Sequence, residues 1–178
     1  MVSGFDDLKK RAAEAKGKIV LFNVPFTEYR ETVIVRTQGA IHAARAGAVA
    51  SLIRSVGPFS MQTPHTGGMS YANGVKKIPH AALSLEDANM LTRMAARGEK
   101  ITVRLKMEAH MLPDGISRNV IAEIPGWEKP EEIVIVSGHI DSWDIGQGAM
   151  DDGGGCLAAW EAARLMLKLG LNPRRTVR

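Results

Sequence analysis

The chain has little of three things: cysteine, aromatic side chains and long apolar runs. Its single cysteine, Cys156, cannot form a disulfide within the chain, which excludes a small fold held together by internal disulfides. The longest apolar run, residues 19–26, is interrupted by Asn23 and Pro25 and is far shorter than the roughly 20 residues of a membrane span. Residues 1–15 are charged and contain no apolar signal-peptide core, so neither a membrane span nor a signal peptide is indicated.

Aromatic residues make up only 5% of the 178 residues, and the 23 Lys and Arg residues are scattered along the chain. Surfaces that bind nucleic acids combine clustered basic residues with aromatic side chains on which bases stack. Because the net charge is only +4 and no such surface is visible, we expect no nucleic-acid partner. A composition of 45% hydrophobic and 24% charged residues is that of a globular protein with one domain or two small ones.

The first 112 residues have the pattern of a small α/β module. Compact apolar or alternating runs predict strands at residues 18–24, 32–35, 48–53, 78–83 and 101–107, the last with one side in water. Apolar residues at helical spacing predict helices at residues 5–15, 37–46 and 85–97, and residues 84–87 (Ser-Leu-Glu-Asp) have the form of a capping box at the start of the last one. Residues 57–75 are rich in Gly, Ser, Pro and Asn and are predicted to form a long surface loop.

A Pro-Asp-Gly turn at residues 113–115 marks a boundary, which predicts two domains, 1–112 and 113–178. In the second domain, strands are predicted at residues 119–124 and 133–136, followed by an amphipathic helix at 157–168. The strand at 133–136 is apolar without alternation, which is typical of a strand buried on both faces in the middle of a helix-covered sheet. The predicted fold class is therefore α/β.

The loop after this strand, residues 138–155, carries the chemistry. Ligands bind at the carboxyl ends of strands in open α/β sheets, and this loop contains one histidine and four aspartates. His139 and Asp141 point to the same side if the strand continues, so Asp141 can orient the imidazole ring. Asp151 begins the following helix, where the dipole keeps a carboxylate ionised and able to bridge two cations. Imidazole nitrogen and carboxylate oxygen are a good ligand set for zinc.

Plainer explanations remain open for each part of the loop. His-x-Asp is more often a hydrogen-bonded pair than a metal site, and Asp-Asp-Gly alone is usually a helix cap or turn. The run at residues 146–151 resembles a glycine-rich phosphate loop with Asp in place of the last glycine, and no Gly-x-Ser-x-Gly motif is present. Surface or packing roles are the simplest expectation for the remaining histidines and the cysteine, namely His42, His65, His80, His110 and Cys156.

The loop as a whole is more specific than its parts. Residues 137–155, SGHIDSWDIGQGAMDDGGG, closely resemble the first metal-binding loop of the co-catalytic di-zinc exopeptidases. Residues 17–26, 36–56 and 64–67 resemble the protease-associated domain inserted in some of these enzymes. Residues 118–126 and the run to Arg178 resemble the start of the peptidase segment, whose sheet is mixed and flanked by helices.

This resemblance implies that His139 binds one zinc ion, that Asp151 bridges two, and that Asp141 supports His139. The peptide bond between Asp151 and Asp152 is often cis in this family. The implied reaction is hydrolysis of small peptides or dipeptides by metal-activated water, as in carboxypeptidases and dipeptidases. The resemblance also implies an extracellular or lysosomal location and a possible homodimer of the full-length protein, with no membrane span.

The same resemblance predicts that this chain is part of a longer enzyme. The family's general base and remaining zinc ligands lie beyond Arg178, and Glu131 and Glu132 precede the central strand, at the end opposite the site. Because a catalytic zinc ion needs about three protein ligands, we expect weak zinc binding and no hydrolysis by the chain alone. The alternative is a non-catalytic protease-associated binding module with a remnant metal loop, which a genuine stop codon after Arg178 would favour.

Overall fold

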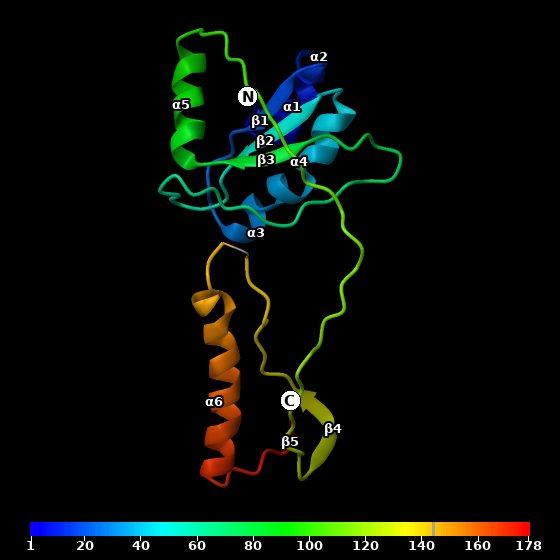
Figure 1. The fold of residues 1–178 in the computed structure, drawn as a ribbon, viewed down its shortest axis with the longest axis vertical. Helices are drawn as coiled ribbons and strands as arrows, with labels where there is room; N and C mark the ends of the chain where they lie inside the picture. The colour runs from blue at the N-terminus through cyan, green and yellow to red at the C-terminus, as the bar shows by residue number, and fades with distance from the viewer. Residues whose placement is uncertain (144) are drawn as a thin grey trace. The chain divides into compact units, whose positions relative to one another are not determined.

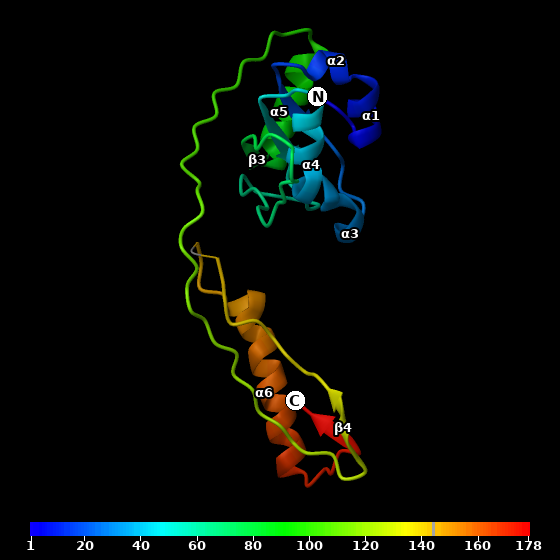
Figure 2. The same ribbon diagram turned by 90° about the vertical axis from the view of Figure 1, so that its right-hand side faces the viewer.

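A computed structural model describes residues 1–143 and 145–178 of the chain, which form two compact units, Met1–His110 and Met111–Arg178 (Figures 1 and 2). Each unit is described by itself. That residues 1–112 and 113–178 are two domains that fold independently stays a prediction.

A three-stranded parallel sheet forms the centre of the first unit. Its strands are β1 (Ile19–Phe22), β2 (Ala50–Arg54) and β3 (His80–Leu83), in the order β1-β2-β3. The register places Leu21 beside Leu52 and Leu52 beside Ala81. The three apolar runs predicted as buried strands at residues 18–24, 48–53 and 78–83 therefore form this sheet.

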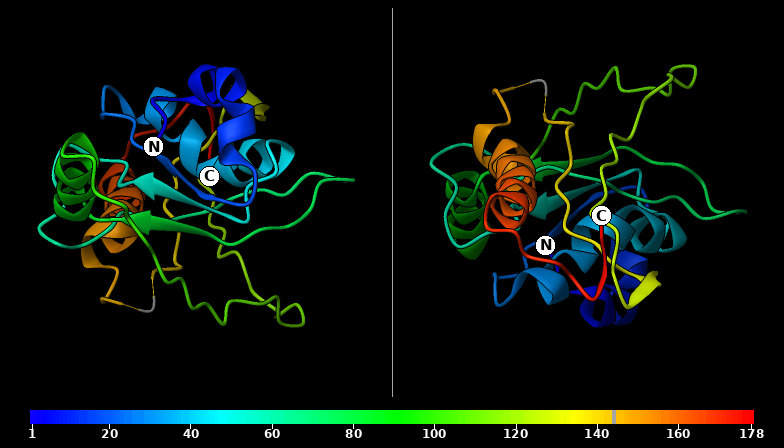
Figure 3. Two further views of the ribbon diagram at one scale, coloured as in Figure 1. Left: turned by 90° about the horizontal axis from the view of Figure 1, so that it is seen from above. Right: turned by 90° about the horizontal axis from the view of Figure 1, so that it is seen from below.

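Five helices belong to the same unit as the sheet, and Figure 3 shows the ribbon from above and below. They are α1 (Phe5–Lys10), α2 (Ala12–Ala15), α3 (Tyr29–Thr32), α4 (Ile34–Arg45) and α5 (Leu85–Ala96). The predicted capping box begins α5, because the Ser84 hydroxyl accepts a hydrogen bond from the Asp87 N–H at 3.0 Å. The stretch 57–75 has neither helix nor strand, as its composition predicts.

Helix α4 packs on the sheet and encloses the core. Phe22, Ala43 and Ile53 are at most 1% exposed, and their burial is the main stabilising contribution of this unit. Helix α4 comes close because residue 39 is glycine. A Cβ atom there would lie 2.8 Å from Cε1 of His80, nearer than real side chains approach.

Two predictions for this unit are wrong. Residues 32–35, predicted as a strand from their β-branched side chains, end α3 and begin α4, because the helix that follows extends back through them. Residues 101–107 form no strand, although Ile101, Val103 and Leu105 are each less exposed than their neighbours. The reason is that a strand requires a hydrogen-bonded partner, and the described residues offer none at this position.

The second unit contains β4 (Lys129–Val134), the short turn η1 (Ala149–Gly153), helix α6 (Gly154–Lys168) and β5 (Arg175–Val177). Strands β4 and β5 are parallel, and an isolated antiparallel bridge joins Ile124 to Val177. The sheet is therefore mixed, and the chain as a whole is α/β as predicted.

Two expectations fail in the second unit. Residues 119–124 form a single bridge in place of a strand. The apolar run at residues 133–136 is 43–67% exposed, not buried on both faces. The physical reason is that no helix of the described residues packs extensively over the faces of β4, from which its side chains project. No helix in the described ranges combines the length and the apolar character that crossing a membrane requires.

Candidate metal centre

The loop that joins β4 to α6 brings the predicted ligands together. His139 follows β4, and Asp151 lies in η1 immediately before α6, so residues twelve positions apart meet across the loop. The backbone angles of Asp151 and Asp152 are not helical, and the peptide bond between them is cis. Asp144, the fourth aspartate of the loop, lies outside the described residues.

The imidazole of His139 lies between two acidic residues. Its Nε2 is 2.9 Å from Oδ1 of Asp151, and its Nδ1 is 2.9 Å from the backbone oxygen and 3.2 Å from Oδ1 of Asp141. The pKa of His139 lies above its ordinary value, first because the Asp141 carbonyl accepts a hydrogen bond from the ring and then because the Asp151 carboxylate does so. The structure thus brings together all three residues singled out in the sequence.

Asp152 holds this arrangement in place, a feature that the sequence patterns did not reveal. Its Oδ2 accepts a hydrogen bond from the His139 N–H at 3.1 Å, and its Oδ1 accepts one from the Gly155 N–H at 3.0 Å. A Cβ atom at Gly155 would collide with the Asp152 carboxylate, and one at Gly138 would lie 2.9 Å from its Oδ2. Gly138 and Gly155 therefore allow the backbone to enclose the Asp152 carboxylate, and glycines near the aspartates are the sequence signal for such a close approach.

The geometry of His139 and Asp151 is compatible with a shared zinc ion. Two ligand atoms of a tetrahedral zinc are roughly 3.3–3.5 Å apart when each bond is about 2.0–2.2 Å. The observed 2.9 Å is a hydrogen-bond distance, so opening it by a few tenths of an ångström would admit the ion. Among the residues that the structure describes, no group of three or more His, Cys, Asp or Glu side chains could hold a metal ion. The role of these residues as ligands stays a prediction.

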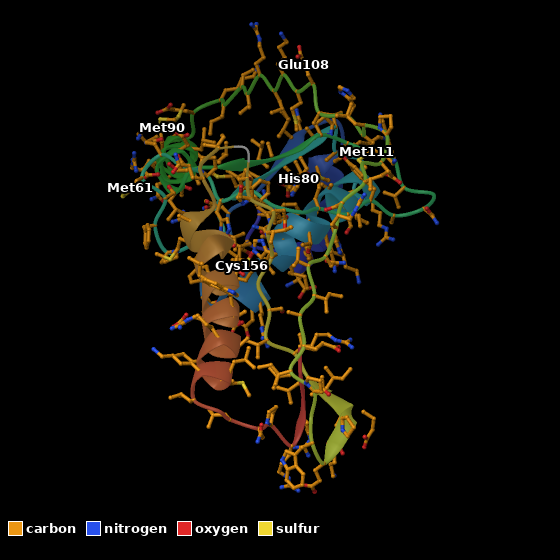
Figure 4. All side chains as sticks on the ribbon, turned by 60° about the horizontal axis from the view of Figure 1, so that its bottom comes forward. Met61, His80, Met90, Glu108, Met111 and Cys156 are labelled. Atoms are coloured by element: carbon orange, nitrogen blue, oxygen red, sulfur yellow. The ribbon has the colours of Figure 1, made fainter. Side chains whose placement is uncertain are left out.

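The other candidate residues have local contacts. His42 stacks on Phe5 with ring centroids 3.9 Å apart, and His80 is buried in the core. The Nδ1 atom of His65 hydrogen-bonds to the backbone oxygen of Val56, and that of His110 to the backbone oxygen of Glu108. Cys156, at the start of α6 (Figure 4), is half-buried rather than in a core, and its thiol donates to the His139 carbonyl at 3.2 Å.

Two protein-family models match the chain. The PA domain model matches residues 3–91, and the model of peptidase family M28 matches residues 119–178. The junction between the two matches contains the predicted boundary at residues 113–115 and the start of the second compact unit at Met111.

Individual relatives agree with both models. The chain is 56% identical to carboxypeptidase Q of Homo sapiens and 58% identical to that of Xenopus laevis, over all of its 178 residues. A solved structure of a peptidase M28 precursor from Shewanella amazonensis is 36% identical, with a TM-score of 0.86 over 98% of this chain and 41% of that one. A probable leucine aminopeptidase 2 of Aspergillus fumigatus is 28% identical over 159 residues, covering 89% of this chain and 29% of that protein.

The chain spans 38% of the length of the carboxypeptidase Q relatives. The resemblance to zinc exopeptidases with an inserted protease-associated domain is confirmed at the level of family and fold, over both parts of the chain. The chain therefore belongs to the PA domain family through residues 3–91, and residues 119–178 are similar to peptidase family M28.

Proposed function

We propose that the full-length protein is a zinc-dependent exopeptidase of the carboxypeptidase or dipeptidase type that hydrolyses small peptides. The observation that supports this most is the convergence of His139 Nε2 and Asp151 Oδ1 at 2.9 Å, in a chain 56% identical to carboxypeptidase Q. Two zinc ions, when bound, polarise the scissile carbonyl and lower the pKa of a shared water molecule.

Each residue of the loop has a separate task in this proposal. Asp141 accepts a hydrogen bond from His139 Nδ1–H, through its carbonyl at 2.9 Å or its carboxylate at 3.2 Å, and so leaves the Nε2 lone pair for zinc. His139 then contributes one neutral nitrogen ligand. Asp151 contributes the bridging carboxylate. Asp152 holds the backbone of His139 against α6 through its hydrogen bonds to the two N–H groups.

The described residues offer two ligands, whereas two catalytic zinc ions need more. The chain by itself is therefore expected to bind zinc weakly and to leave peptides intact, with the general base and remaining ligands supplied by the full-length protein. In that protein, domain 1–112 is a protease-associated module and domain 113–178 is the beginning of the peptidase. A secreted or lysosomal location and a homodimer form part of the same proposal, by analogy with the carboxypeptidase Q relatives.

A zinc titration by calorimetry combined with a dipeptidase assay tests this proposal. We expect weak binding and no turnover for residues 1–178, and peptide hydrolysis by the full-length protein that Asp151→Ala abolishes. Tight binding of two zinc ions with turnover by residues 1–178 would contradict the role assigned to the missing ligands.

The alternative function is a non-catalytic binding module. The observation that favours it is that all but one of the buried side chains lie in the first unit, which thus has a core of its own. A full-length protein that fails to hydrolyse dipeptides in the presence of zinc would support this alternative.

A further inference from the structure

The first unit contains a buried guanidinium group with no negative partner. Arg36, on α4, is only 9% exposed, and no carboxylate among the described residues lies within 4.0 Å of it. Its Nε is buried and has no hydrogen-bond acceptor. Burying a charge without a counter-charge is costly, so such a group calls for an explanation.

The groups that touch Arg36 are neutral. Nη1 donates to the backbone oxygen of Thr66 at 3.0 Å, and Nη2 donates to the Tyr29 hydroxyl at 2.9 Å. The Tyr29 ring lies 5.8 Å below the guanidinium carbon, and the His65 ring stacks on Tyr29 at 5.7 Å. The cation–π contact and two neutral hydrogen bonds compensate only part of the charge.

The cover over the guanidinium is a piece of the long loop. A Cβ atom at Gly67 would lie 2.5 Å from Cζ and 2.9 Å from Nε of Arg36, so the bare backbone of Gly67 is in contact with the guanidinium. Gly68 follows, with open space where its Cβ would be. Gly67 therefore covers the guanidinium with backbone alone, and hydrogen bonds of the neighbouring His65 and Ser70 to Ser55 and Thr37 hold the segment on either side.

A purely structural role, in which Arg36 pins this loop, explains the contacts of Nη1 and Nη2 but not the unpaired Nε. The other buried polar side chains differ in this respect, since both ring nitrogens of His80 have partners. Arg54 also has an Nε without an acceptor, but it is only partly buried and its Nη1 reaches two Asn side-chain oxygens, on Asn23 and Asn89. Arg36 is thus the buried cation whose charge is least compensated among the described residues.

We propose that Arg36 and Tyr29 form a binding site for a carboxylate group, which the Gly67 segment covers when the site is empty. On binding, the segment moves aside, and the carboxylate oxygens accept hydrogen bonds from Nε and Nη2, the edge of the guanidinium that Gly67 covers, while Nη1 keeps its hydrogen bond to Thr66. The Tyr29 hydroxyl supplies a further donor. A monoanionic, planar carboxylate matches one guanidinium in both charge and fork geometry, whereas a phosphate dianion would require further cations. All of these residues belong to the first unit, so the site is independent of zinc.

An NMR titration of the whole chain tests this site. The probe is N-acetylglycine, and N-acetylglycinamide is the matched compound without the negative charge. We expect saturable shifts of the Tyr29, Thr66 and Gly67 amides with the acid only. Arg36→Met should weaken binding by about tenfold or more, because a charge-assisted hydrogen bond is lost. The exposed Arg93 on α5 provides the control, since Arg93→Gln should leave the affinity unchanged.

Two further variants keep the proposal testable if Arg36→Met fails to fold. Tyr29→Phe keeps the ring and should weaken binding by a few fold. Gly67→Ala should strengthen binding, because the added Cβ prevents the Gly67 segment from resting on the guanidinium. If Arg36 has a purely structural role, no variant should bind the ligand. Equal shifts with the amide, tighter binding of inorganic phosphate than of the acid, or no saturable shift in both the wild type and Gly67→Ala would each overturn the proposal.

Discussion

The two units of this chain contain similar apolar patterns but bury them very differently. In the first unit, the strand residues Phe22 and Ile53 are at most 1% exposed beneath α4. In the second, Ile133 of β4 and Ile135 just after it are 43% and 67% exposed, and Trp160 of α6 is 65% exposed. An apolar segment therefore needs other apolar segments to pack against, and it becomes part of a core only where the chain supplies them.

The difference has a thermodynamic consequence. Burial of apolar area is the dominant favourable term in folding, and among the described residues of the second unit only Thr176 is buried. The second unit should therefore be much less stable than the first. The following changes test this comparison, beginning with the largest expected effect.

Phe22→Ala should destabilise the first unit by about 3–5 kcal/mol, because it leaves a cavity beneath α4 and removes the edge contact with Phe5. Trp160→Ala removes an even larger side chain from an exposed site and should change stability by less than about 0.5 kcal/mol. Urea unfolding followed by hydrogen exchange of the β2 amides measures the first change, and circular dichroism of α6 measures the second. Similar losses for both variants would refute the contrast between the units.

His139→Ala should lower the zinc affinity of the chain by about 100-fold. Asp141→Ala removes the carboxylate but keeps the backbone carbonyl that accepts the 2.9 Å hydrogen bond, so it should lower the affinity by about tenfold at most. Calorimetric titration measures both values. His42→Gln is the control, since that ring stacks on Phe5 in the first unit and should have no effect. An unchanged zinc affinity in His139→Ala would show that zinc binds to other residues of the chain.

Ser84→Ala should cost about 1 kcal/mol, because the Asp87 N–H loses its acceptor at the start of α5. Helix α6 has no side-chain hydrogen bond at its own N-cap, Gly153, so Gly153→Ala removes no cap there. Thermal unfolding of each variant measures the effect. A loss in Ser84→Thr equal to that in Ser84→Ala would argue against the hydroxyl as the cause.

The smallest effect concerns pH. Burial lowers the pKa of His80, and the hydrogen bond from the ring to the Arg36 carbonyl partly opposes this shift. Since the unfolded chain then binds more protons than the folded one, the first unit should lose stability as the pH falls below about 6.5, the ordinary histidine value, towards the lowered pKa. Stability measured between pH 7.5 and 5 in the wild type and in His80→Gln tests this, and the variant should show a flatter dependence.

Local sequence patterns predicted the fold well where each element satisfies its own requirements. The three apolar strands and the capped helix α5 were predicted, because compact β-branched runs and a Ser-x-x-Asp cap act over a few residues. The helical structure of residues 32–35 was not predicted, because the helix that includes most of them outweighs the modest β-propensity of Val and Ile. Residues 101–107 kept their alternation of burial but formed no strand, since pairing depends on a partner.

The candidate site shows the same division. The sequence indicated which residue types bear the chemistry, and the resemblance assigned roles to His139, Asp141 and Asp151. The enclosure of the Asp152 carboxylate by Gly138 and Gly155 depends on distances between the strand end and α6, so no spacing rule could reveal it. The unpaired charge of Arg36 was hidden for the same reason, because burial is a property of the packed chain.

The sequence by itself determined the family and predicted a two-part organisation and candidate metal ligands, because these depend on the order and chemical nature of the side chains. Only the tertiary structure decided which apolar runs are buried, which carboxylate supports the backbone of His139 and which arginine lacks a partner. These outcomes depend on contacts between segments that are distant along the chain, and such contacts exist only after folding.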